Sequence, residues 1–195
     1  CLMEYGEFKT VKEQEVKKHI NEILKKNTVA QIYEAVHDAE EAGALCIGWD
    51  RSVYPVRQTA LAALAREDLF VEEEEGAVVA AAIINQTQVP EYALCSWEYP
   101  AQENEVMVLH TLVVDPRCSG RGYGTAFVAF YEEYAGAHGC AYLRMDTQEM
   151  NRGARRLYAS LGYREPGIVP CVFNGIPDVR LVCLEKKLDL ATQAQ

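Results

Sequence analysis

Three glycines at alternate positions, Gly120, Gly122 and Gly124, are the residues whose spacing points most directly to chemistry. The run Leu109 to Val114 before them is mostly apolar and rich in β-forming residues, which is typical of a buried strand. After them the apolar spacing becomes helical, and one helix face is expected to carry Tyr123, Phe127, Phe130 and Tyr134. The pattern therefore predicts a strand, a glycine-rich turn and a helix.

A glycine-rich turn that opens a helix can bind an anion. The first helical amides have no partner inside the helix, and the helix dipole places partial positive charge there. Glycines let a phosphate approach the backbone, and Arg121 and Arg117 can add positive charge. The alternative is a tight turn that needs glycine only for its dihedral angles, but three alternating glycines favour the ligand. The dinucleotide fingerprint fails at Thr125, and the Walker pattern is absent.

Two segments carry a family resemblance. Val114 to Gly124 resembles motif A of the GNAT acetyltransferase superfamily, whose usual form is V-x-P-x-x-[R/Q]-G-x-G-x-G. Ser119 departs from it, because the family usually has Arg or Gln there, and Arg117 and Arg121 are the residues that can compensate. The second segment resembles motif B, N-x-x-A-x-x-x-Y-x-x-x-G-[FY], with the matching residues Asn151, Ala154, Tyr158, Gly162 and Tyr163.

The resemblance covers roughly residues 69 to 187 and implies an α+β fold, a three-layer arrangement with a mixed, mainly antiparallel, splayed sheet flanked by helices. It implies acetyl-CoA as co-substrate, and direct attack by an amine in a ternary complex. The cofactor-binding residues that it implies are Leu112, Val113, Val114, Ser119, Gly120, Arg121, Gly122, Tyr123, Gly124, Thr125, Asn151 and Tyr158. The departure at Ser119 keeps a second possibility open, an acyl-CoA-binding regulatory module without transferase activity.

Catalysis of acetyl transfer needs a base, an oxyanion donor and an acid. An alkylamine with a pKa of about 10 is only about a thousandth neutral at pH 7, whereas histidine titrates near 6.5, so His110 is the preferred base. The alternative role of His110 is that of a hydrogen-bonded core histidine. Glu105 is the rival base, but if both residues lie in one strand their side chains point to opposite faces, so both cannot face the site. The resemblance implies a strand amide near residues 110 to 112 as oxyanion donor and Tyr158 as the acid that protonates the departing thiolate.

Four residues are candidates for substrate binding. Trp49 and Tyr54 fall in an expected loop, and loop aromatics line ligand pockets as readily as they anchor a core. Together with Trp97 and His110 they resemble a bacterial subgroup of the superfamily whose substrate is unknown. Asp146, at the end of an expected strand, can bind a substrate ammonium, although a surface or turn-stabilising role is the alternative. The expected acceptor is a small-molecule amine, with a peptide still possible.

Periodicity and caps predict the surrounding elements. Two helices are expected before residue 44, one with an apolar stripe of Val16, Ile20, Ile23 and Leu24, and one that begins at Thr28 and ends at Gly43. Pro55 is expected to open a helix through Arg66. A hairpin is expected around Glu72-Glu73-Glu74-Glu75-Gly76, as a solvated tip, because alternating strand faces cannot focus four carboxylates on a metal ion. Later expected elements are strands at 140–147, 168–173 and 177–185 and a helix after Asn151 that Gly162 ends.

Composition limits the class of protein. The chain of 195 residues is expected to be one acetyltransferase domain, with 1–67 mainly helical and 69–187 the acyl-CoA-binding core. A formal charge of −10 disfavours nucleic acid as a partner. Seven scattered cysteines without C-x-x-C pairs favour reduced thiols in the cytoplasm over disulfides or a metal site. No signal peptide or membrane partner is expected, and a homodimer is possible.

Overall fold

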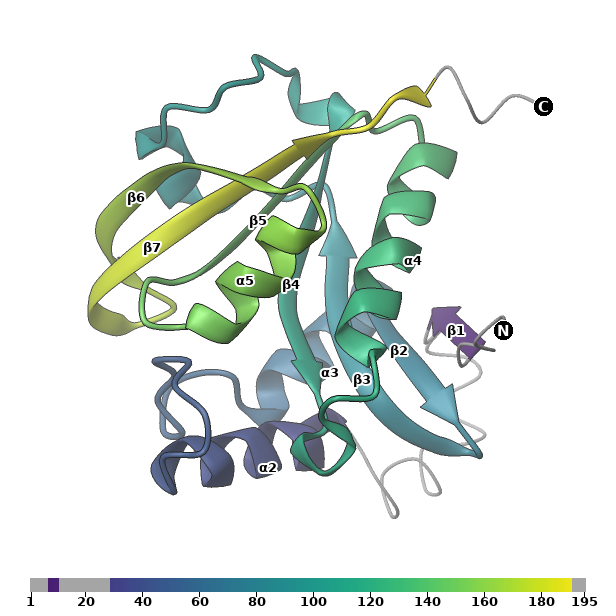
Figure 1. The fold of residues 1–195 in the computed structure, drawn as a ribbon, viewed down its shortest axis with the longest axis vertical. Coiled ribbons are helices and arrows are strands. Elements are labelled where there is room, and N and C mark those ends of the chain that lie inside the picture. Colours follow the sequence, from purple (N-terminus) through teal and green to yellow (C-terminus); the bar gives the residue numbers. More distant parts are fainter. Residues whose placement is uncertain (1–6, 11–28, 191–195) are drawn as a thin grey trace. The chain divides into compact units, whose positions relative to one another are not determined.

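The computed structural model describes residues 7–10 and 29–190, drawn in colour in Figure 1. The chain forms two compact units that alternate along the sequence. The first contains the described residues up to 45 together with 49–83 and 111–128, and the second contains 46–48, 84–110 and the described residues from 129 onward. No helix in the described ranges is long and apolar enough to cross a membrane.

The strands form a mixed sheet in the order β1-β2-β3-β4-β5-β7-β6. β4 and β5 pair in parallel, whereas β1–β2, β2–β3, β5–β7 and β6–β7 pair antiparallel. The predicted α+β class with a mainly antiparallel sheet is therefore confirmed. The strands are β1 (Glu7–Thr10), β2 (Leu69–Glu74), β3 (Ala77–Asn85), β4 (Val106–Val114), β5 (Tyr142–Gln148), β6 (Arg164–Phe173) and β7 (Ile176–Lys187). The helices are α2 (Val29–Glu41), α3 (Arg57–Ala65), α4 (Tyr123–Ala137) and α5 (Arg152–Ser160), with short 3-10 turns η1 (Pro90–Leu94), η2 (Glu103–Glu105) and η3 (Pro116–Cys118).

The central strand β4 is the element on which the predicted site depends. Its pairing with β5 joins Val106–Leu109 to Tyr142–Met145, one residue short of His110. Beyond that point β5 continues alongside β7 as far as Gln148. As predicted, β4 ends immediately before Asp115-Pro116, because proline has no N–H for a further ladder bond.

Local signals placed most helix ends correctly. The Asn151 side chain accepts a hydrogen bond from the backbone N–H of Ala154 at 3.2 Å, which is the predicted N-cap of α5. Gly162 follows α5 with φ of 86°, and Gly43 follows α2 with φ of 72°, both in the left-handed region that glycine adopts without steric cost. The apolar stripe predicted at Val16 to Leu24 lies outside the described residues.

Two helix predictions need correction. The buried face of α4 runs through Tyr123, Phe127 and Tyr131 at intervals of four, whereas Phe130 and Tyr134 are only half-buried on its flank. The aromatic spacing alone could not decide between these two neighbouring faces. Helix α3 begins at Arg57, and Pro55 precedes it with its carbonyl accepting a hydrogen bond from the buried His37 ring at 2.9 Å.

The predicted hairpin is present, with β2 and β3 joined at Glu75-Gly76, but its acidic run is not uniformly solvated. Glu74 and Glu75 are exposed, whereas Glu72 is fully buried in β2 opposite Ala80 of β3. Among the residues that the structure describes, neither carboxylate oxygen of Glu72 has a hydrogen-bond partner. Burial, together with the nearby charge of Glu74, raises the pKa of Glu72 to about 7. The solvated-tip interpretation is therefore wrong for Glu72, which belongs to a run of consecutive buried residues, Leu69 to Glu72, at the start of β2.

The raised pKa of Glu72 predicts a stability that falls with increasing pH. In the folded state Glu72 keeps its proton up to a pKa of about 7, whereas in the unfolded chain it releases the proton near its ordinary pKa of 4.5. The free energy of unfolding therefore declines between about pH 4.5 and 7 and is constant above that range. Glu72→Gln should remove this decline and stabilise the protein at pH 8 by about 1–3 kcal/mol, while changing little at pH 5. Urea denaturation at both pH values measures this, with the exposed Glu75→Gln as the matched control. Equal pH dependence in wild type and Glu72→Gln would contradict the assignment.

Candidate functional site

The glycine turn lies in the first unit, between β4 and α4. Gly120 and Gly122 have φ values of 79° and 89°, a conformation that L side chains rarely adopt. A Cβ built on either glycine would meet no atom of the described part of the chain within 4 Å. Gly120 and Gly122 are exposed, so at these two positions the turn presents its backbone to an approaching ligand.

The geometry of this turn fits a phosphate. Helix α4 has fifteen residues, and its first amides have no partner within the helix. The backbone N–H of Ala126 is the first to bond back, to the carbonyl of Gly122 at 3.0 Å. The amides of Tyr123, Gly124 and Thr125 therefore precede the hydrogen-bonded part of the helix, beside two glycines with open space above them. Such an arrangement can hold the pyrophosphate that the sequence analysis predicts.

The charges beside the turn differ from the expected pair of arginines. Arg117 is held by the buried carboxylate of Asp115, with Nε 2.9 Å from Oδ1, and this contact lowers the pKa of Asp115. Arg121 lies with Nη1 3.9 Å from Oε2 of Glu74, which also accepts a hydrogen bond from the Tyr123 hydroxyl. Both guanidinium groups thus have a carboxylate partner beside the turn and remain largely exposed, so the prediction that they compensate for Ser119 stays a prediction.

The end of β4 carries a backbone irregularity that the sequence analysis did not predict. Thr111 has φ of 52°, although it is β-branched and lies within a strand. After it, Val113 is buried, whereas Leu112 and Val114 are only partly covered. The strand residues predicted to contact the cofactor, Leu112 to Val114, thus come directly after a residue in the left-handed conformation.

The predicted substrate loop also belongs to the first unit. The Trp49 ring packs edge-on against His37 and Tyr54, with centroid distances of 6.4 and 6.1 Å. Tyr54 joins its hydroxyl to the hydroxyl of Thr111. Both aromatic residues are half-buried, and both have specific protein partners, so they are anchors of the loop as well as candidates for substrate contact.

His110, in the second unit, has a defined orientation. Its Nε2 lies 3.1 Å from Oδ1 of Asn85, and the same Oδ1 accepts the backbone N–H of Thr87 at 2.8 Å. Because a backbone N–H can only donate, the Asn85 atom at this position is the oxygen, and His110 must donate through Nε2. In neutral His110 the basic lone pair therefore resides on Nδ1.

The rival base, Glu105, lies outside the strand. It ends η2, and its Oε2 accepts the backbone N–H of Gln102 at 2.8 Å. The parity argument that set Glu105 against His110 therefore does not apply, since β4 begins at Val106. The carboxylate of Glu105 has instead a structural partner in its own turn.

Asp146, Tyr92 and Tyr158 form an electrostatically coupled group in the second unit. The Tyr92 hydroxyl donates to Oδ2 of Asp146 at 2.7 Å. Burial raises the pKa of Asp146 to about 7, with the charge of Glu91 adding to the shift and the Tyr92 hydrogen bond opposing it. Burial, and then the charge of Asp146, raise the pKa of Tyr158, which is 7% exposed on α5. Asp146 is thus half-buried and held in place by the Tyr92 hydroxyl.

Trp97 has a structural environment. Its Nε1 donates to the Tyr92 carbonyl at 2.9 Å, and the guanidinium of Arg144 lies 4.1 Å from its ring centroid. Arg144 is 6% exposed and donates to the Tyr99 carbonyl at 3.1 Å. A buried cation covered by an aromatic ring accounts for Trp97, so its predicted substrate contact has the least support among the four candidates.

Several residues that matter here were not singled out from the sequence. Asn85 orients His110, Tyr92 holds Asp146, and Thr111 joins Tyr54. Asn85 ends an apolar strand run, which is the one sequence signal that could have marked it. The other two look like ordinary strand and turn residues in the sequence.

Comparison with known proteins identifies the family of this chain. The model of a family described as "Acetyltransferase (GNAT) family" matches residues 29–163. An uncharacterized N-acetyltransferase of Methanocaldococcus jannaschii, MJ1207, is 35% identical over 75 residues, which are 38% of this chain and 33% of that protein. YhfO of Bacillus subtilis, another uncharacterized N-acetyltransferase, is 35% identical over 60 residues, 31% of this chain and 40% of that protein. The chain thus spans well under half the length of either curated relative.

Solved structures resemble the chain over most of its length. A GNAT-family acetyltransferase from Streptococcus agalactiae superposes with a TM-score of 0.69 and 19% identity, covering 94% of this chain and 95% of that one. Another, from Listeria monocytogenes, gives a TM-score of 0.65 and 18% identity, with 94% and 95% covered. At this level of identity the similarity concerns the fold.

Proposed function

Because this chain belongs to the GNAT family of acetyltransferases, we propose that it transfers the acetyl group of acetyl-CoA to the amine of a small molecule, by direct attack in a ternary complex. The family assignment confirms the prediction of an N-acetyltransferase domain, and the donor, acceptor and mechanism are the proposal. The observation that carries it is the open glycine turn at the N-terminus of α4, within the family-matched segment. The proposed compartment is the cytoplasm, where scattered cysteines remain reduced.

In this proposal His110 removes the proton that the acceptor ammonium must lose. Its Nε2–H remains hydrogen-bonded to the Asn85 side-chain oxygen, so Nδ1 receives the proton, directly or through one water. The freed nitrogen lone pair attacks the thioester carbonyl carbon and a C–N bond forms. The carbonyl π electrons move to oxygen, where a strand amide near Thr111 or Leu112 stabilises the negative charge.

Collapse of the tetrahedral species breaks the C–S bond, and Tyr158 donates its proton to the thiolate. The attacking nitrogen gives up its extra proton to solvent as the neutral amide forms, and solvent returns a proton to the Tyr158 phenolate. The phenol is weakly acidic, and burial raises its pKa further, so positioning rather than acidity supplies the advantage. Asp146 is proposed to attract the substrate ammonium when it is charged. Its pKa of about 7 makes that attraction stronger on the alkaline side of neutrality.

A first test concerns the glycine turn. Gly122→Val places a branched side chain where phosphate must approach, and should weaken acetyl-CoA binding at least about tenfold in calorimetry. Gly139→Val is the matched control, because Gly139 also has a left-handed φ, 74°, and open space around its Cβ position, but follows the C-terminus of α4. Both variants place a branched side chain on a left-handed backbone, so the melting temperature should fall in both. Undiminished affinity in folded Gly122→Val would reject the cofactor site, and Gly122→Ala serves if the valine variant fails to fold.

A second test concerns Tyr158. Tyr158→Phe removes the proton donor and keeps the ring, which packs edge-on against Tyr163 at 6.1 Å. We expect kcat to fall about ten- to a hundredfold with acetyl-CoA affinity within about twofold, because the acid acts only as the thiolate leaves. Steady-state kinetics and calorimetry measure the two quantities. Unchanged turnover under rate-limiting chemistry would show that another group is the acid.

A third test concerns His110. Since only neutral imidazole accepts a proton, kcat/KM should rise with pH through one ionisation, and His110→Gln should cut it by about two to four orders of magnitude and abolish that limb. Part of the loss should be recovered at alkaline pH, where the amine arrives neutral. Asn85→Asp should move the limb to higher pH, because a carboxylate beside Nε2 favours imidazolium.

The pH profile also separates the alternatives. If the limb persists unchanged in His110→Gln, the base is another group or the limb is the substrate's own ionisation. If wild type binds acetyl-CoA but acetylates no amine in a broad acceptor screen with free-thiol detection, the chain is the acyl-CoA-binding module considered above. Neither result depends on the outcome for Tyr158.

A further inference from the structure

The left-handed backbone of Thr111 requires an explanation from its surroundings. A β-branched residue at φ of 52° is a strained conformational outlier, which persists only where neighbouring groups hold it. Thr111 directly follows His110 and directly precedes Leu112, the stretch whose amides are proposed to stabilise the oxyanion. Whatever holds Thr111 therefore also sets the direction of these amides.

Tyr54 is in contact with Thr111 at the right place to hold it. The two hydroxyl groups are hydrogen-bonded, although 57 residues separate them in the sequence. The ring of Tyr54 is itself supported edge-on by Trp49 at 6.1 Å. The Tyr54 side chain is therefore packed against Trp49 through its ring and hydrogen-bonded to the strand through its hydroxyl. These two contacts restrict the rotation of the Thr111 side chain and backbone.

The loop that carries Tyr54 is fixed in turn. Its backbone closes on Asp50, whose carbonyl accepts the N–H groups of Val53 at 2.9 Å and Tyr54 at 2.7 Å. The Asp50 side chain accepts from both the N–H and the hydroxyl of Ser52, at 2.8 and 2.6 Å, and these bonds lower the pKa of Asp50. The turn from Asp50 to Tyr54 is thus closed by four hydrogen bonds.

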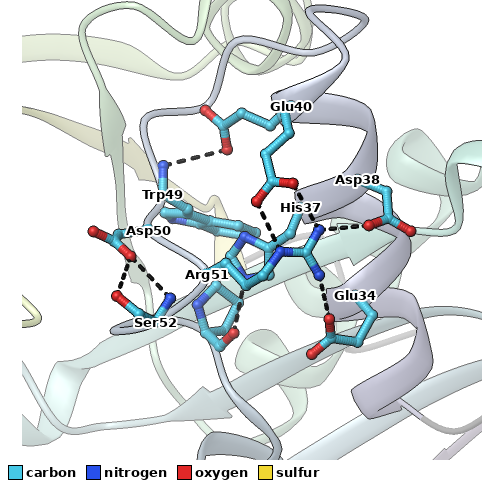
Figure 2. Close-up of polar contacts among 10 residues, drawn as sticks. Glu34, His37, Asp38, Glu40, Trp49, Asp50, Arg51 and Ser52 are labelled. Carbon is cyan, nitrogen blue, oxygen red and sulfur yellow. Dashed lines mark hydrogen bonds and ion pairs between the residues drawn. The ribbon is translucent and has the colours of Figure 1, made fainter.

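Arg51 anchors this turn to α2. Figure 2 shows its guanidinium directed at the carboxylates of Glu34 and Asp38, and it also pairs with Glu41, Nε to Oε1 at 2.8 Å. These three carboxylates follow one another at intervals of four and three residues, so they share one face of the helix. Exposed ion pairs add little stability individually. A planar guanidinium shared among three carboxylates nevertheless fixes the orientation of the residue, and hence of the loop.

We propose that Tyr54 is a positioning residue for acetyl transfer, which acts through its hydrogen bond to Thr111 and not by contacting the acceptor. The ion pairs of Arg51 with α2 fix the loop, and the loop fixes the position of the Tyr54 phenol. The phenol in turn keeps the backbone at Thr111 in the conformation that directs the neighbouring amides. This role rests on the proposed function and replaces the expectation that Tyr54 lines the substrate pocket.

The test compares Tyr54→Phe with Tyr99→Phe, which removes a hydroxyl from a half-buried tyrosine outside the loop. Tyr54→Phe should lower kcat about ten- to a hundredfold, because misdirected amides stabilise the oxyanion poorly, while KM for acetyl-CoA and for the acceptor stays within about twofold. Tyr99→Phe should change neither. A rise in the acceptor KM with unchanged kcat would overturn the proposal and return Tyr54 to substrate binding.

A double-mutant cycle with Thr111→Gly isolates the mechanism. Glycine adopts the left-handed conformation without strain, so the strand no longer needs the phenol to hold it. The kcat loss on Tyr54→Phe should therefore shrink to within about threefold in the Thr111→Gly background. An equal loss in both backgrounds would overturn the proposal.

Hydrogen–deuterium exchange of the backbone amides from 110 to 113, in the full chain, gives a readout that does not need activity. Exchange there should accelerate at least about tenfold in Tyr54→Phe and not in Tyr99→Phe. Unchanged exchange in Tyr54→Phe would overturn the proposal. A wild-type protein without transfer activity would reject the proposed function, whereas the exchange result would still decide whether Tyr54 holds the strand.

Discussion

The carboxylate of Asp115 fixes the place where the central strand becomes the glycine turn. It is 3% exposed, and it accepts both the backbone N–H and the guanidinium of Arg117. Its own backbone N–H donates to the Val79 carbonyl of β3 at 2.8 Å. Because Arg117 lowers the pKa of Asp115, the carboxylate stays ionised at neutral pH and remains a strong acceptor. The left-handed Gly120 and Gly122 can then lead into α4 from a defined starting point.

The parts of the fold that follow from the sequence are those whose cause is local. An asparagine cap, a glycine after a helix, and a proline after a strand each act on neighbouring backbone, so Asn151, Gly162 and Pro116 could be placed correctly. The glycine turn is of the same kind, since its dihedral angles and its open approach are properties of the residues themselves. Amphipathic spacing is less exact, which is why the buried face of α4 passes through Tyr131 instead of Phe130.

The parts that could not be predicted depend on partners far away in the sequence. Strand β1 exists only through its pairing with β2, about sixty residues later. Tyr92 and Asp146 are 54 residues apart, and Trp97 covers an arginine whose burial no local pattern indicates. The acidic composition suggested a solvated surface, yet Glu72 is buried, and carboxylates on α2 share one arginine. Net charge describes the sum of such carboxylates and says nothing about which of them have structural roles.

The partner of His110, the residue proposed as the base, is a neutral amide. A carboxylate beside Nε2 would orient the ring equally well, but it would also stabilise imidazolium and leave less of the neutral form at pH 7. The amide oxygen of Asn85 accepts the Nε2 proton without carrying charge, and the backbone N–H of Thr87 fixes which end of the amide faces the ring. Orientation and tautomer of the His110 ring are thus set by a neutral partner. Such a partner is compatible with the proposed role of His110, because it does not itself favour the imidazolium form.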